Sequence, residues 1–148
     1  MRDYPADLKQ IFSDYQADIE NCRNNYKPVD GLFGISQSMK DDICHDRFDS
    51  RTEALALEFA STNPSPEEAD QVIRLLLFPD CFQGLPLSAQ WMLRAAERHS
   101  VPLIPFLAPD DAMSFYQQYT LRYPPRDRLP AQNKICKALL AAAAKERK

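Results

Sequence analysis

The sequence predicts an all-α protein, and three observations favour that class. Apolar side chains recur at intervals of three and four residues along most of the 148-residue chain, as they do in amphipathic helices. No segment shows the alternation of apolar and polar residues, bounded by hairpin turns, that is typical of β-strands. The chain has twelve prolines but only three glycines, which argues against a fold built on glycine turns. The length suits a single domain over residues 1–148 with a core of its own.

The first predicted helix lies between Pro5 and Pro28, which fit as its boundaries. Its apolar stripe consists of Leu8, Ile11, Phe12, Tyr15, Ile19, Cys22 and Tyr26. Residues 29–44 are predicted to form a loop, and a loop of that length in a compact helical domain is often functional. The second predicted helix runs from Asp46 to Ala60 and places Phe48, Leu55 and Phe59 on one face.

Four further helices are predicted from proline and capping signals. The third begins with Ser65 as N-cap, Pro66 at the first helical position and Glu68 completing a capping box. The fourth covers Ser88 to His99 and is expected to turn Trp91, Met92, Ala95 and Ala96 inward. The fifth begins at Pro109 and ends before Pro124, with an apolar face of Ala112, Phe115, Tyr116 and Tyr119. The sixth begins at Pro130 and carries Ala131, Ile135, Ala138, Leu139 and Ala142.

A weak internal repeat suggests how these six helices are arranged. The run Pro66-Glu67-Glu68-Ala69 is echoed 43 residues later by Pro109-Asp110-Asp111-Ala112. That period falls in the range of HEAT and armadillo arrays, in which helical hairpins stack into a short solenoid. We therefore expect stacked antiparallel hairpins over 5–62, 66–108 and 109–148. An irregular helical bundle is the alternative, because helix starts are stereotyped enough to resemble one another by chance.

Charge and cysteine usage indicate which partners and which cellular compartment to expect. Residues 122–148 hold eight basic and two acidic side chains, although the whole chain carries a net charge of -3. No aromatic residue is interleaved with the bases after Tyr123, so a solvated last helix is expected rather than a nucleic-acid interface. The apolar runs are too short to cross a bilayer, and the first residues lack the apolar stretch of a signal peptide. We expect free thiols and a cytoplasmic protein, because the cysteines at 22, 44, 81 and 136 contain no Cys-x-x-Cys pair.

The stretch Cys44, His45 and Asp46 holds more side chains capable of catalysis or metal binding than any other part of the sequence. Each is a possible metal ligand, and a cysteine with a histidine can also serve as nucleophile and base. Neighbouring residues on a helix point about 100° apart, however, so the three cannot converge on one ion. Spacing instead favours His45 with Asp49, or Asp42 with Asp46, completed by His99 or Cys81 from elsewhere.

Structural roles compete with these chemical ones. Asp42 or Asp46 can cap a helix that begins here, and Cys44 can be buried. His99, near the end of its predicted helix, suits a capping or core position as well as a catalytic one. No cofactor is required by any of these patterns, and a metal ion is the one candidate.

Two other segments could form binding sites. Residues 31–40 contain glycines, hydroxyls and a lysine, but their spacing is not that of a phosphate-binding loop. There we expect tight turns anchored by Phe33. The fifth helix and the turn after it carry tyrosines beside arginines, two residue types that dominate binding hot spots. The candidate binding surface consists of Tyr116, Tyr119, Arg122, Tyr123, Arg126, Arg128 and Phe33.

The pattern Gly31-Leu32-Phe33-Gly34 followed by Cys44-His45-Asp46-Arg47-Phe48 resembles a family of small helical proteins from anaerobic Gram-positive bacteria. The resemblance extends to Trp91-Met92-Leu93 and to Arg128-Leu129-Pro130. That family is uncharacterised, so the resemblance implies a bacterial setting and no activity.

The sequence therefore leads to two functional hypotheses. The first is a non-enzymatic binding or adaptor module for a protein partner or a second copy of the chain. Its contact surface would be the Tyr/Arg region of residues 116–128 or the ridge formed by residues 31–49. The second is a small metal- or thiol-dependent enzyme centred on Cys44 and His45, with His99 or Asp49 assisting. The enzyme needs these side chains to converge around a pocket, whereas the adaptor needs an exposed apolar patch.

Overall fold

The computed structural model describes residues 2–25, 37–79 and 86–145, and these residues form six α-helices and no strand. The all-α class predicted from the sequence is confirmed. The α-helices are α1 (Tyr4–Asn25), α3 (Gln37–Ser61), α4 (Pro66–Leu77), α5 (Leu87–Ala96), α6 (Pro109–Arg122) and α7 (Pro130–Ala143). Three short 3-10 helices join them: η1 (Glu97–Ser100), η2 (Ile104–Phe106) and η3 (Pro125–Asp127). No helix in the described part of the chain has the length and apolarity needed to cross a membrane.

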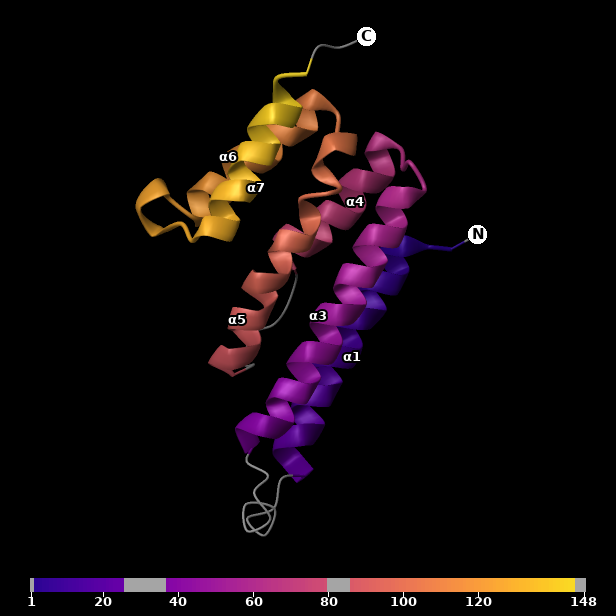
Figure 1. The fold of residues 1–148 in the computed structure, drawn as a ribbon, viewed down its shortest axis with the longest axis vertical. Helices are drawn as coiled ribbons and strands as arrows, with labels where there is room; N and C mark the ends of the chain where they lie inside the picture. Colours follow the sequence, from indigo (N-terminus) through magenta and orange to yellow (C-terminus); the bar gives the residue numbers. More distant parts are fainter. Residues whose placement is uncertain (1, 26–36, 80–85, 146–148) are drawn as a thin grey trace.

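Helices α1 and α3 lie side by side and run antiparallel, as Figure 1 shows. Their aromatic side chains pair across the seam: Tyr15 stacks on Phe48 with ring centroids 4.3 Å apart, and Tyr4 packs against Phe59. The buried positions of α3 repeat at alternating intervals of four and three residues, which is the spacing of a coiled-coil seam. These seam positions are Asp41, His45, Phe48, Thr52, Leu55 and Phe59, and Ala56 is buried beside them.

The predicted loop over residues 29–44 is wrong for its second part, because α3 begins at Gln37 rather than at Asp46. The reason lies in the two seam positions of this extension, Asp41 and His45, which are buried but polar. A search for apolar periodicity cannot see a helix whose buried face is polar. The remaining part of the predicted loop, including Phe33, lies outside the described residues.

Beyond the α1–α3 pair, the chain builds a second layer. Helix α4 packs against α1, and α5 lies against α3. Helices α6 and α7 pack along one another, far from the C-terminal end of α1, and η2 lies against α7 (Figure 1). The predicted start of α4 is confirmed, since the Ser65 hydroxyl accepts a hydrogen bond from the Glu68 amide at 3.2 Å.

The orientation of α5 differs from the prediction. Its buried side chains are Ala89, Leu93 and Ala96, whereas the Trp91 side chain was expected to point inward and is 57% exposed. Trp91 lies two residues from Ala89 and from Leu93, which is about 200° around the helix and therefore on the opposite face. Two of the three buried side chains are alanines, and small side chains let a helix pack closely against its neighbours.

Candidate functional site

Helix α3 and η1 meet at a charged contact centred on Asp49. The His99 ring, nine-tenths buried, donates from Nε2 to Oδ1 of Asp49 at 2.8 Å. The Arg98 guanidinium donates to Oδ2 of the same carboxylate at 2.6 Å. Burial opposes ionisation, but the hydrogen bonds from Arg98 and His99 outweigh it and hold the pKa of Asp49 below its ordinary value. Asp49 is therefore an ionised carboxylate that joins two segments separated by about fifty residues.

Glu53 adds a third possible metal ligand beside Asp49 and His99. It lies one helical turn after Asp49, on the same face of α3. One ligand atom from each of Asp49, Glu53 and His99 can be chosen so that all three lie within 4.8 Å of one another. A cavity of about 200 Å³ opens beside them and is lined by Glu53, Ala56, Leu57, Arg98, His99 and Pro102. An imidazole and two carboxylates at this separation form a donor set suited to a divalent cation.

Asp49 and His99 were predicted as separate candidates from the sequence, whereas Glu53 was not predicted. The spacing of four residues between Asp49 and Glu53 is visible in the sequence. It gives no reason to select this acidic pair over others on α3, because the histidine that faces it is 50 residues away. Asp46, which was predicted as a ligand, is exposed and does not belong to this group of donors.

His45 occupies a different site, in the seam between α1 and α3. Its Nδ1 lies 2.5 Å from the Tyr15 hydroxyl, and its ring packs edge-on against the Tyr15 ring. The predicted pairing of His45 with Asp49 is wrong, because the carboxylate turns toward η1 instead. His45 Nε2 is buried and has no hydrogen-bond partner among the described residues. His45 and His99 are therefore not brought together.

The thiols near His45 are not activated for nucleophilic chemistry. Burial raises the pKa of Cys44, and burial together with hydrogen bonding to Asp41 raises the pKa of Cys22 to about 11. A nucleophilic cysteine needs the opposite shift, toward the thiolate. The Cys44 thiol donates to the Asp18 carbonyl oxygen at 3.9 Å, and no hydrogen bond to His45 is found within the described ranges. Cys81, the other candidate partner, lies outside the described residues.

Two tyrosines of the predicted binding surface belong to the core instead. Tyr119 and Tyr123 are buried, and each hydroxyl donates to the Glu97 carboxylate, at 2.7 and 3.0 Å. They cannot contact a partner on the surface, so this part of the prediction is wrong. The physical reason is the buried Glu97 side chain, whose oxygens need donors once water is excluded.

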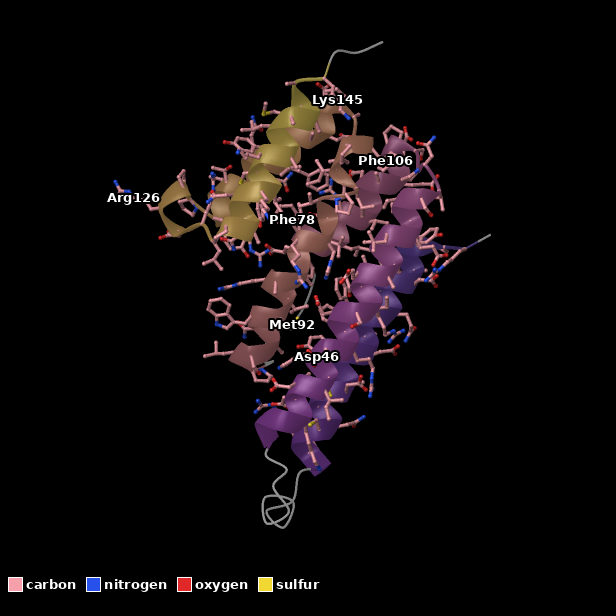
Figure 2. All side chains as sticks on the ribbon, in the orientation of Figure 1. Asp46, Phe78, Met92, Phe106, Arg126 and Lys145 are labelled. Atoms are coloured by element: carbon pink, nitrogen blue, oxygen red, sulfur yellow. The ribbon has the colours of Figure 1, made fainter. Side chains whose placement is uncertain are left out.

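Of the other residues of that predicted surface, two arginines hold neighbouring backbone segments, and the others make no such contact in the described part of the chain. Arg122 donates to the Leu77 carbonyl oxygen at 2.8 Å. Arg128 donates to the Tyr123 carbonyl oxygen at 2.9 Å and so holds the turn before α7. Tyr116 is half-buried, whereas Arg126 is exposed and projects from the edge of the molecule (Figure 2).

An exposed apolar surface lies close to this region, and we call it the Trp91 face. It consists of the exposed side chains of Leu87, Trp91 and Leu129 and of an adjoining cavity of about 190 Å³. The cavity is lined by Trp91, Arg94, Ala95, Arg98, Leu129, Ala131 and Gln132. It joins the outer side of α5 to the start of α7. The binding surface predicted from the sequence includes Arg128 but not its neighbour Leu129, because an isolated leucine in a turn carries no periodic signal.

Comparisons with protein-family models, curated proteins and solved structures found no match to this chain.

Proposed function

We propose that the protein is a binding module that holds an acidic amphipathic helix of a partner protein against the Trp91 face. The single observation that carries this proposal is the exposure of Trp91 at the mouth of an apolar cavity. Large exposed apolar side chains around a pocket are typical of interaction sites, and tryptophan is among the residues most enriched in binding hot spots.

The shape of the face favours a helix as the occupant. The cavity combines side chains of α5 with side chains from the start of α7, so it lies between two elements. A helix that lays its apolar stripe into such a groove is a common mode of peptide recognition. Leu87, one helical turn before Trp91, is 73% exposed and extends the apolar contact along α5.

The charge of the cavity selects an acidic partner. Among the residues that the structure describes, its lining includes Arg94 and Arg98 and no acidic side chain. Arg98 already binds Asp49, whereas the Arg94 side chain is exposed to solvent. Carboxylates flanking the apolar stripe of a partner would complement these guanidinium groups and fix the orientation of the helix.

The stacked-hairpin arrangement predicted from the repeat belongs to the same proposal. The antiparallel packing of α1 with α3 and of α6 with α7 supports two of the three hairpins. In a short solenoid of this kind, surfaces at the joints between hairpins are available to partners. In this proposed arrangement, the Trp91 face would lie at the joint between the second and third hairpins.

Trp91 is the only tryptophan of the chain, so its fluorescence reports directly on the face. The experiment pans a displayed library of helical peptides on the protein, and then titrates the enriched peptides while the Trp91 emission is recorded. We expect enriched peptides with an apolar residue every three or four positions flanked by Asp or Glu, and a blue shift of the emission on binding. Arg94→Glu should weaken their binding by about tenfold or more, as loss and reversal of a close charge pair does.

Leu121→Ser serves as the matched control, because Leu121 is an exposed leucine on α6 outside the cavity. The same peptides should bind this variant and wild type equally. Equal enrichment on wild type and on Leu129→Ser would contradict the proposal. So would concentration-dependent dimerisation abolished by Leu129→Ser, since the occupant would then be a second copy of the chain.

A further inference from the structure

We propose that Asp49, Glu53 and His99 form a binding site for one zinc ion that links α3 to η1. This site is separate from the Trp91 face and does not depend on the proposed function. The three donors come from two elements that are already in contact, so the metal would find them largely in position. Their chemistry, one imidazole nitrogen and two carboxylate oxygens, is within the usual ligand set of zinc.

The distances support this ion. Zinc–ligand bonds of about 2.0–2.1 Å in a tetrahedron place neighbouring ligand atoms about 3.3 Å apart. His99 Nε2 and Asp49 Oδ1 are now 2.8 Å apart, joined by the proton that Nε2 carries. A zinc ion would take the place of this proton, with the ring proton moving to Nδ1 or to solvent. The two atoms need to separate by only about half an ångström.

Glu53 supplies the movable ligand. Its side chain is exposed and makes no ion pair or hydrogen bond with any residue in the described part of the chain, so no existing contact has to break. A rotation about its side-chain torsions brings the carboxylate to the ion. Because Asp49 and Glu53 are four residues apart on a helix, their carboxylates can reach one ion from the same side.

Arg98 affects the proposed zinc site in two opposite ways. Its guanidinium carries a positive charge close to the proposed ion, which lowers the affinity. It binds Oδ2 of Asp49, however, and leaves Oδ1 to the metal. A ligating carboxylate whose second oxygen is held by a hydrogen bond is the usual arrangement around protein metal sites. We therefore expect the site to form, with lower affinity than a site without the arginine.

The cavity beside His99 leaves room for the fourth ligand. It is lined by Glu53 and His99 and has a volume of about 200 Å³, ample for a water molecule. Three protein ligands and one exchangeable position distinguish catalytic zinc sites from closed structural ones.

The test is calorimetric titration of the chelator-treated full chain with zinc chloride. We expect one zinc ion per chain and a rise in thermal stability on binding. Glu53→Gln should lower the affinity at least tenfold with an unchanged circular dichroism spectrum, because the exposed side chain does not contribute to folding. Asp46→Asn is the matched control, as an exposed acid on the same helix, and should bind zinc like wild type.

The His99→Gln variant should not bind zinc. If this variant does not fold, the Glu53→Gln variant still tests the site, because Glu53 is exposed. Three results would overturn the proposal. They are absence of stoichiometric binding to wild type, equal affinity in Glu53→Gln, and binding lost in Cys44→Ser while Glu53→Gln retains it. The last result would place the zinc on the thiols in the α1–α3 seam.

Discussion

The Tyr119 hydroxyl donates to Oε2 of Glu97 at 2.7 Å, and this bond joins α6 to the short helix that follows α5. Tyr123 donates to the other carboxylate oxygen, and the Arg122 guanidinium lies 3.8 Å from it. Glu97 is 1% exposed, so its carboxylate depends on these groups instead of water. Burial raises the pKa of Glu97 to about 7, although the tyrosines and Arg122 oppose the shift.

This relationship predicts a pH dependence of stability with a definite sign. The pKa of Glu97 is higher in the folded state than its ordinary value of 4.5, so the folded state binds more protons between pH 4.5 and 7. The unfolding free energy should therefore fall as pH rises through that window, by on the order of 3 kcal/mol, since each pKa unit is worth about 1.4 kcal/mol. Urea unfolding of wild type and Glu97→Gln at a series of pH values measures this contribution.

Glu97→Gln keeps the shape of the side chain but cannot ionise, so its curve should lack this decline. The difference between the two proteins should be smallest near pH 4.5, where Glu97 is protonated in the folded state, and largest near neutral pH, where wild type has lost this contribution. Parallel curves for the two proteins would show that Glu97 does not change its ionisation in this window.

A double-mutant cycle at Tyr15 and His45 should measure how much the buried polar pair in the α1–α3 seam lowers the free energy of unfolding. Tyr15→Phe removes the partner of His45 Nδ1 and leaves both ring nitrogens without a hydrogen bond, which should cost about 1–3 kcal/mol. Replacing both residues, as Tyr15→Phe with His45→Leu, removes the hydroxyl and both ring nitrogens together and should restore wild-type stability or exceed it. Chemical denaturation of the four proteins tests this. A double variant less stable than Tyr15→Phe alone would mean that His45 Nε2 has an essential partner.

Asp49→Asn should destabilise the contact between α3 and η1. The neutral amide binds Arg98 and the buried His99 more weakly, and we expect a loss of about 1–3 kcal/mol in metal-free protein. Asp70→Asn is the comparison, because Asp70 pairs with Arg74 on the surface of one helix and should cost about 0.5 kcal/mol or less. Similar losses in the two variants would show that the Asp49 contact behaves as an ordinary surface pair.

The orientation of α5 can be checked with two residues that differ by two positions. Trp91→Ser should change the unfolding free energy by about 0.5 kcal/mol or less, since most of the side chain faces solvent. Leu93→Ala should cost about 2–5 kcal/mol, since Leu93 is buried in the core. Thermal or urea melts of both variants provide the test. A larger loss of stability in Trp91→Ser than in Leu93→Ala would contradict this orientation and support the one predicted from the sequence, with Trp91 facing inward.

Local pattern was sufficient for much of the secondary structure. The stripe of Leu8, Ile11, Tyr15 and Ile19 is buried as the periodicity indicates, and Ser65 caps α4 as its sequence context indicates. Both signals arise from residues within one or two helical turns, where spacing along the chain determines direction in space. The start of α3 was missed because Asp41 and His45 occupy seam positions that are usually apolar.

The sequence by itself determined that the chain is helical and which side chains of most helices share a face, since helical geometry is a local property. Only the tertiary structure decided which faces are covered and which chemical groups meet. It brings His99 to Asp49, which lies 50 residues earlier in the chain, and to Glu53. It also places Tyr119 on Glu97 inside the core and leaves Trp91 in solvent. The physical reason is that burial and contact depend on the packing of elements distant in the chain, and periodicity carries no information about which element packs on which.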